Sequence, residues 1–168
     1  MNPTIRPATA ADIPAAQAIY AHHVLHGTGT FELDPPSVAE MQTRFHDLSG
    51  RDYPYAVAEA GDEIVGFGYV GPFRERRAFR HTVEDSIYLH PDKRGLGIGS
   101  LLLNALIERS TAQGFTQMVA LIGDSDNRAS VALHAKFGFE PTGTMRQVGF
   151  KFDRRLDVVI MQRRLVRS

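Results

Sequence analysis

The fold of this chain is decided by the stretch His90-Pro91-Asp92-Lys93-Arg94-Gly95-Leu96-Gly97-Ile98-Gly99-Ser100-Leu101-Leu102, in which alternating glycines join a strand-like segment to a helix-like one. Glycine has no Cβ, so such a turn can curl round an anion and present backbone amides to it. The first turn of the following helix adds unpaired N–H groups and the positive end of the helix dipole. The stretch therefore predicts a phosphate or pyrophosphate site, and the alternative is a glycine-rich turn that binds nothing.

The spacing of the glycines separates the known types of phosphate loop. A Walker A loop ends in Gly-Lys-Ser/Thr, but no lysine follows Gly99. A dinucleotide fingerprint reads Gly-x-Gly-x-x-Gly, whereas this chain has Gly95-x-Gly97-x-Gly99. The observed Arg94-x-x-Gly97-x-Gly99 after a hydrophobic strand resembles the acyl-CoA loop of the GCN5-related N-acetyltransferase (GNAT) superfamily. The resemblance implies acetyl-CoA as co-substrate, with its pyrophosphate held by Arg94, Gly95, Leu96, Gly97, Ile98, Gly99 and Ser100.

Length and composition favour one globular domain without metal or thiol chemistry. The chain has 168 residues, 43% of them hydrophobic, so we expect a single domain over residues 1–168. Its formal net charge is zero, which argues against nucleic acid or an anionic membrane as a partner. The absence of cysteine excludes disulfides, thiolate metal sites and an acyl-cysteine intermediate. The histidines show no zinc-binding spacing, so we expect no metal.

The sequence shows neither a secretory signal nor a membrane span. Residues 1–7 lack the apolar run of a signal peptide, and no stretch reaches the roughly eighteen apolar residues of a span. We therefore expect a cytoplasmic protein.

Hydrophobic periodicity and turn residues predict an alternation of strands and helices. Thr9 with Asp12 is predicted to start the first helix, and Ser37 with Glu40 the second. The third helix is predicted to stop at Gly114 and to bury a stripe of Leu101, Leu102, Ala105 and Leu106. Strands are predicted over residues 5–8, 55–59, 64–70, 83–89, 116–122, 139–148 and 156–165, and a fourth helix over residues 129–137.

These elements predict an α/β domain with a mixed sheet flanked by helices. Residues 116–122 are nearly all apolar, as expected in the middle of a sheet covered on both faces. The order β-α-α-β-β-β-α-β-α-β-β is also the arrangement of the GNAT fold, which supports the interpretation of the glycine loop.

Residues 127–139 resemble the second cofactor segment of the GNAT family, commonly Asn-x-x-Ala/Ser-x-x-Leu-Tyr-x-x-x-Gly-Phe. The resemblance implies that Asn127 and Ser130 bind the pantetheine arm of coenzyme A. His134 replaces the tyrosine that stands near the thioester sulfur, where it could support the departing thiol or relay a proton. The alternatives are a helix N-cap for Asn127 and a packed histidine for His134. Coenzyme A would also be aligned by the backbone of Ile87, Tyr88 and Leu89.

Glu84 is the candidate general base. An amine must lose its proton before it can attack a thioester, because an ammonium has no lone pair. Glu84 lies at the start of the apolar strand that leads into the glycine loop, where an acidic side chain is otherwise out of place. Burial would raise its pKa, and it could act directly or through water. The alternative is a solvated carboxylate at a strand end.

Residues 79–89, Leu133-His134, Gly138-Phe139 and residues 147–153 resemble the phosphinothricin and methionine sulfoximine acetyltransferases, and the similarity runs from Ile5 to about Leu165. In that branch Glu84 matches the base and His134 its partner, the substrates are small amino-acid analogues, and the enzymes form homodimers. The resemblance implies an acceptor site formed by Phe31, Arg74, Arg76, Glu84, Asp85, Ser86 and Lys151.

These acceptor residues also have simpler readings. Guanidinium groups suit an anionic amino acid, but Arg74, Arg76, Arg77 and Arg80 could equally form a solvated loop. Phe31 could be a core residue and Lys151 a solvent-facing one. Some relatives carry tryptophan where this chain has Phe73 and Arg155, and the chain has no tryptophan at all, so we expect an altered pocket wall.

The combined prediction is an acetyl-CoA-dependent enzyme that acetylates the α-amino group of a small amino acid or analogue by direct attack in a ternary complex. Two other readings stay open. One is an acetyltransferase for protein N-termini or another small amine, although the arginines disfavour a polycation. The other is an acyl-CoA-binding sensor without turnover.

Overall fold

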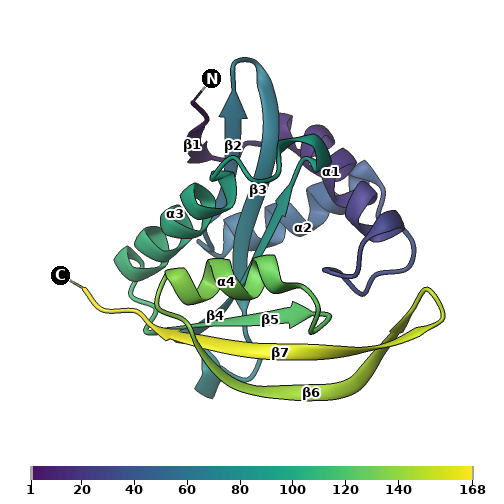
Figure 1. The fold of residues 1–168 in the computed structure, drawn as a ribbon. Helices are drawn as coiled ribbons and strands as arrows, with labels where there is room; N and C mark the ends of the chain where they lie inside the picture. The colour runs from purple at the N-terminus through teal and green to yellow at the C-terminus, as the bar shows by residue number, and fades with distance from the viewer. Residues whose placement is uncertain (1, 168) are drawn as a thin grey trace.

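The computed structural model describes residues 2–167 and forms a mixed sheet with helices on both faces (Figure 1). The sheet has seven strands in the order β1-β2-β3-β4-β5-β7-β6, and β4 and β5 run parallel. The strands are β1 (Thr4–Pro7), β2 (Tyr55–Ala60), β3 (Glu63–Pro72), β4 (Thr82–Leu89), β5 (Gln117–Gly123), β6 (Glu140–Lys151) and β7 (Arg154–Arg164). The helices are α1 (Ile13–His26), α2 (Val38–Gly50), α3 (Ile98–Ala112) and α4 (Arg128–Lys136), with short 3-10 turns at Ala10–Asp12, Arg77–Phe79 and Pro91–Lys93. The predicted fold class and element order are confirmed.

Helix ends follow the local chemistry that the sequence indicates. The Ser37 Oγ accepts a hydrogen bond from the Glu40 amide at 3.1 Å, so the predicted cap of α2 is present. Just after the C-terminal end of α3, Gly114 has a φ of 94°, a left-handed conformation that glycine adopts without strain. The predicted stop of this helix is therefore confirmed.

The buried stripe of α3 shares Leu102 and Leu106 with the predicted one, while Ala105 is only partly buried. Leu101 is 43% exposed, whereas Leu102, Leu103, Leu106 and Ile107 are buried. The helix begins at Ile98 with its first turn set by the glycine loop, and this start fixes which face turns to the sheet. The prediction of Leu101 as a core residue was wrong because periodicity alone leaves the phase of a leucine-rich run open.

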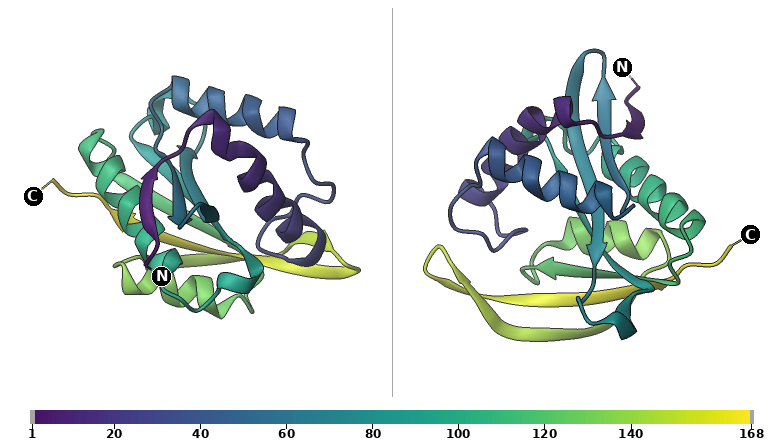
Figure 2. Two further views of the ribbon diagram at one scale, coloured as in Figure 1. Left: turned by 90° about the horizontal axis from the view of Figure 1, so that it is seen from above. Right: turned by 180° about the vertical axis from the view of Figure 1, so that it is seen from behind.

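Two hydrophobic clusters lie on opposite faces of the sheet. Helices α1 and α2 cover one face through Ile13, Ile19 and Met41, which pack with Tyr55 and Phe67 of the sheet. Helices α3 and α4 cover the other face, where the α3 stripe meets strands β2 to β5 and β7. The two views in Figure 2 show this layering from above and from behind. Within residues 2–167, no helix is both long and apolar enough to cross a membrane.

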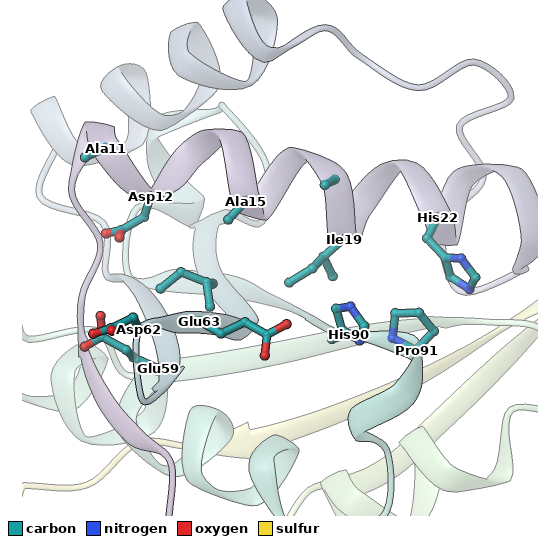
Figure 3. A pocket seen from close by; sticks show the side chains of 12 residues that line it. Ala11, Asp12, Ala15, Ile19, His22, Glu59, Asp62, Glu63, His90 and Pro91 are labelled. Carbon is teal, nitrogen blue, oxygen red and sulfur yellow. The ribbon is translucent and has the colours of Figure 1, made fainter.

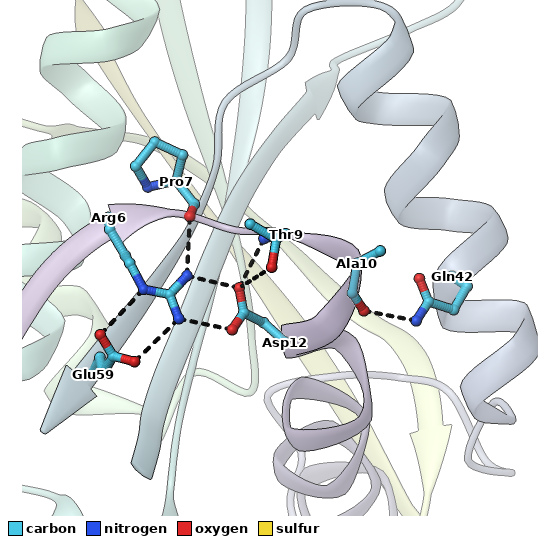
Figure 4. Close-up of polar contacts among 7 residues, drawn as sticks. All are labelled: Arg6, Pro7, Thr9, Ala10, Asp12, Gln42 and Glu59. Carbon is cyan, nitrogen blue, oxygen red and sulfur yellow. Dashed lines mark hydrogen bonds and ion pairs between the residues drawn. The ribbon is translucent and has the colours of Figure 1, made fainter. Parts of the chain in front are cut away.

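A partly buried ion pair joins the first strand to the start of the first helix (Figure 4). Arg6 donates to both carboxylate oxygens of Asp12 at 2.8 Å and to Glu59 on β2 at 3.2 Å. Asp12 also accepts from the Thr9 amide at 2.7 Å, which closes the predicted helix start. The hydrogen bonds from Arg6 are the largest influence that lowers the pKa of Asp12, to about 2.

We expect Asp12→Asn to lower the free energy of unfolding by about 1–3 kcal/mol at neutral pH, because Arg6 then loses a charged, bidentate partner. The loss is measurable by urea unfolding. Since the pKa of Asp12 rises from about 2 when folded to about 3.9 when unfolded, its stabilisation is present above about pH 4 and disappears as the pH falls toward 2.

The matched control is Asp47→Asn, which removes an exposed partner of Arg51 on α2. Its effect should stay below about 0.5 kcal/mol, as for other exposed pairs. Equal effects of the two substitutions would contradict a special role for the Asp12 pair.

Candidate active site

The site is built around a gap that opens between β4 and β5. The two strands pair at Thr82↔Gln117, Val83↔Met118 and Glu84↔Val119, and then separate. Beyond Glu84, β4 keeps its partner β3 as far as Leu89, and β5 keeps its partner β7 as far as Gly123. One edge of β4 therefore has no strand partner from Asp85 to Leu89.

Backbone groups of β4 line this gap. The His90 amide donates to the Val65 carbonyl of β3, and in an antiparallel pair alternate residues face the same neighbour. The backbone groups of Asp85, Ile87 and Leu89 therefore face the gap, while those of Tyr88 turn toward β3. This arrangement suits the predicted cofactor contacts of Ile87 and Leu89 and leaves Tyr88 to pack its ring on the other side of the sheet.

His23 closes one end of the open edge. Its Nε2 lies 2.7 Å from the Leu89 carbonyl oxygen, so this nitrogen donates its proton there. Burial lowers the pKa of His23, which keeps the ring neutral near pH 7. The sequence reading missed this residue, since nothing in the pattern of α1 distinguishes His23 from the neighbouring His22 and His26.

The glycine loop has the conformation that an anion cradle requires. Gly95 and Gly97 have φ angles of 74° and 78°, and an added Cβ would meet no atom within 4 Å at either position. Glycine is therefore needed here for backbone conformation, and the space beside both residues is open. Gly97 caps α3, so the amides of Ile98, Gly99 and Ser100 form the unpaired first turn of that helix.

Gly99 serves packing instead. A Cβ at Gly99 would approach Leu133 of α4 to 3.3 Å, so its small size lets the two helices come close. Beside this contact, the Lys136 ammonium donates to the Ser100 hydroxyl at 3.3 Å. Lys136 thus places a positive charge at the start of α3. Its position on another helix explains why the loop sequence did not reveal it.

Glu84 lies at the last residue pair before the strands part. Burial raises its pKa, the Asp85 charge adds to this effect, and Arg74 opposes it. Ser86 shares its face of β4, opposite Tyr69 of β3. A carboxylate with a raised pKa at the end of an open gap has the properties of a general base.

His134 is buried and has Asp85 as its partner. Its Nε2 lies 2.8 Å from the Asp85 carboxylate, and its Nδ1 lies 2.7 Å from the Ser130 carbonyl oxygen. Successive side chains of a strand point to opposite faces, so Asp85 turns toward α4 whereas Glu84 turns away from it. The expected pairing of His134 with Glu84 is therefore replaced by a pair with Asp85.

Asn127 has the N-cap contact that the simpler reading predicts. Its Oδ1 accepts from the Ser130 amide at 3.3 Å at the start of α4. The side-chain nitrogen of Asn127, Nδ2, lies 3.9 Å from the position that a Cβ on Gly29 would occupy. The side chain thus stands between α4 and the loop that follows α1.

That loop brings Phe31 and Lys151 together, although they are far apart in sequence. The Lys151 ammonium, only 3% exposed, donates to the Thr30 carbonyl at 2.9 Å, and burial lowers its pKa. The ring of Phe31 lies against Gly123 and Gly149, since a Cβ built at either glycine would fall within 3 Å of it. Lys151 is therefore not the solvent-facing residue of the simpler reading.

Asp124 fixes this loop to the end of β5. Its carboxylate accepts from the Thr28 hydroxyl at 2.8 Å and from the Asp126 amide at 3.0 Å. Asp124 adopts a left-handed φ of 73°, and its carbonyl accepts from the Asn127 amide. The same turn therefore supports the loop around Phe31 and the start of α4.

The two predicted arginine ligands are exposed. Arg74 stacks over the Phe73 ring at 4.4 Å and acts electrostatically on Glu84. Arg76 precedes a 3-10 turn and is exposed. Of the two, Arg74 is the one that the structure brings near Glu84.

Two hollows were not predicted. One, of about 260 Å³, is lined by Tyr20, Arg44, Tyr55, Phe67 and Tyr69 together with neighbours from α2, on the sheet face that Ser86 shares. The other is an open groove between α1 and the β2–β3 hairpin, lined by Glu59, Glu63, His22 and His90 among others (Figure 3). None of the predicted site residues lines the groove. No cluster of three or more metal-ligating side chains occurs within residues 2–167.

Comparison with known proteins shows which family has this fold and glycine loop. Residues 19–139 match the family model described as Acetyltransferase (GNAT) family. The chain belongs to the GNAT acetyltransferase family.

Relatives of this GNAT protein match almost its whole length. It is 45% identical over 162 residues to a phosphinothricin N-acetyltransferase of Alcaligenes faecalis, covering 96% of this chain and 82% of that protein. It is 44% identical over 163 residues to an L-methionine sulfoximine/L-methionine sulfone acetyltransferase of Pseudomonas aeruginosa, covering 96% and 94%. A crystal structure of a phosphinothricin acetyltransferase from Sinorhizobium meliloti in complex with AcCoA superposes with a TM-score of 0.95 at 48% identity, covering 98% of this chain and 89% of that one.

We expect Gly97→Ala to weaken acetyl-CoA binding about tenfold, because a left-handed alanine costs roughly 1–2 kcal/mol and the loop would relax away from its cradle shape. Isothermal calorimetry measures the change in affinity. The control is Gly143→Ala on β6, where space is open and φ is not left-handed. Unchanged affinity in the Gly97 variant would contradict the proposed cradle.

Proposed function

We propose that this GNAT protein transfers the acetyl group of acetyl-CoA to the α-amino group of a small amino acid or analogue, of the phosphinothricin, methionine sulfoximine or methionine sulfone type. The observation that carries the proposal is the position of Glu84. It is the last residue of β4 that pairs with β5, at the end of a gap that leads to a loop of free amides. The named activities of the relatives at 44–45% identity support the acceptor class.

Acetyl-CoA supplies an acetyl group activated as a thioester. The residues suited to hold it are the amides of the glycine loop and first turn of α3, the gap-facing backbone of Ile87 and Leu89, and the cations Arg94 and Lys136. The open space beside Gly95 and Gly97 and the unpartnered edge of β4 fit this assignment. Asn127 contributes to this cofactor site by capping the start of α4.

Glu84 takes the proton that the acceptor amine must lose, directly or through one water. His134 supports the departing thiol from the α4 side of the gap. In the net reaction an N–C bond forms, a C–S bond breaks, and the proton lost by the amine balances the one gained by the thiol. Arg74 is suited to the acceptor carboxylate, while Phe31 and Lys151 form the opposite wall.

The decisive experiment is a thiol-release assay with a panel of amino acids and analogues that includes methionine sulfoximine, methionine sulfone and phosphinothricin. We expect release with at least one of these three. Release only with peptide N-termini or polyamines would favour the other acetyltransferase reading. Binding of acetyl-CoA without release for any acceptor would favour the sensor.

We expect Glu84→Gln to lower kcat about 10²- to 10⁴-fold with little change in acetyl-CoA affinity, because the amide cannot accept the amine proton. The raised pKa of Glu84 also predicts that wild-type kcat/KM falls on the acid side at a higher pH than an ordinary glutamate would give. Steady-state kinetics against pH measure both effects. Glu108→Gln, on exposed α3 surface, is the control and should leave kcat unchanged.

We also propose a cytoplasmic homodimer in which a second copy covers β6. This strand is the last of the sheet, and its Val148 and Phe150 are 58% and 63% exposed. Phe152, in the turn that follows β6, is 51% exposed. An open edge strand with exposed apolar side chains favours pairing with another chain. The edge also continues into Lys151, so a partner there would lie beside the acceptor site.

Phe150→Asp is therefore expected to convert the dimer to a monomer, as measured by sedimentation. Val166→Asp, equally exposed but away from β6, should leave the mass unchanged. A monomeric wild-type protein would contradict this part of the proposal.

A further inference from the structure

Asp85 occupies the first position after β4 leaves β5. The last pair is Glu84↔Val119, and Asp85 then turns its side chain toward α4. Its side chain is only 2% exposed, and that of its partner His134 is 6% exposed. A carboxylate and an imidazole thus meet in the interior, at the closed end of the gap.

The hydrogen bonds of His134 define where its protons are. The Ser130 carbonyl can only accept, so Nδ1 must carry a proton. Nε2 faces the Asp85 carboxylate at 2.8 Å, and an ionised carboxylate also only accepts. With an ionised Asp85, both ring nitrogens donate, and His134 is then an imidazolium with Asp85 as its counter-ion.

The surroundings of His134 agree with this assignment. Burial alone lowers the pKa of His134, but the Asp85 carboxylate and the Ser130 carbonyl together raise it above its ordinary value. Phe139 places its ring edge-on to the imidazole at 4.9 Å and carries no charge. Asp85 from β4 is the charged group that contacts His134 within the described chain, and Glu84 lies on the other face of the strand.

The second carboxylate oxygen of Asp85, Oδ1, is buried and has no hydrogen-bond partner within residues 2–167. Within these residues, the bond to His134 is therefore the side-chain contact that compensates the buried Asp85 carboxylate. A buried carboxylate is costly unless it is paired, which favours a protonated ring facing it.

We propose that Asp85 is a positioning residue for acetyl transfer, which holds His134 as an imidazolium with both N–H groups fixed. His134 then stabilises the departing thiolate by its charge, and the thiolate takes its proton from water and not from the ring. Loss of a ring proton would leave a lone pair facing either the Asp85 carboxylate or the Ser130 carbonyl, which is unfavourable. The inference rests on the proposed function and reassigns Asp85 from the acceptor site, where the sequence had placed it.

The protonation state of His134 can be read by NMR of its ring nitrogens in the free protein, without turnover. We expect both nitrogens to remain protonated at about pH 7.5, well above the ordinary histidine pKa of about 6.5. A His134 that is neutral at this pH would overturn the inference, whatever the activity of the enzyme.

Asp85→Asn tests the role of the carboxylate, since it keeps the shape and removes the charge. We expect His134 to become neutral at about pH 7.5 and kcat to fall about tenfold or more, with the acceptor KM changed less than about twofold. Because acid restores the imidazolium, the ratio of variant to wild-type kcat should rise as the pH is lowered from about 8 to 6. The Asp85 charge also raises the pKa of Glu84, so the rise supports the proposal only if it follows the protonation of His134 measured by NMR in the same variant. A constant ratio would indicate a merely structural role and overturn the proposal.

The control is Asp62→Asn, in the exposed turn between β2 and β3. This substitution should change neither the protonation state of His134 nor kcat. If Asp85→Asn does not fold, the wild-type NMR measurement still decides the protonation state. Failure of the wild type to release thiol would overturn the proposed function and leave the NMR result standing. Full turnover with a neutral His134 would overturn this inference alone.

Discussion

Strand β4 exchanges hydrogen bonds with β5 over only three residue pairs, and this short parallel contact organises the remaining structure. Past Glu84 each strand keeps one neighbour, so the sheet stays continuous at one end and open at the other. The open edge presents backbone groups that would otherwise cost free energy, and they need a partner from elsewhere. His23 supplies one, and the others remain directed into the gap.

The alternation of side chains along β4 divides the chemistry between two faces of the sheet. Glu84 and Ser86 turn to the face covered by α1 and α2, and Asp85 turns to the face of α4. Adjacent carboxylates thereby acquire different environments. Burial raises the pKa of Glu84, whereas the carboxylate of Asp85 is hydrogen-bonded to His134. Two neighbouring acids can thus hold separate roles at one end of the gap.

The region around Phe31 and Lys151 depends on contacts between remote segments. The loop after α1 is held by Asp124 through Thr28, and by Lys151 through Thr30. Gly123 and Gly149 leave space for Phe31, which fills it with its ring. The surroundings of Phe31 are therefore made by residues from three parts of the chain, and their shape follows from the way β5, β6 and this loop meet.

The local signals in the sequence sufficed for the fold class, the order of elements, the glycine loop, the caps at Ser37 and Asn127 and the position of Glu84. These features follow from backbone preferences and from hydrophobic period, which act over a few neighbouring residues. The tertiary structure alone decided that His134 pairs with Asp85, that Lys151 is buried, that Lys136 reaches α3 and that Leu101 faces solvent. Such contacts join residues up to 121 positions apart, and they depend on the angle at which helices and strands pack, which no local pattern encodes.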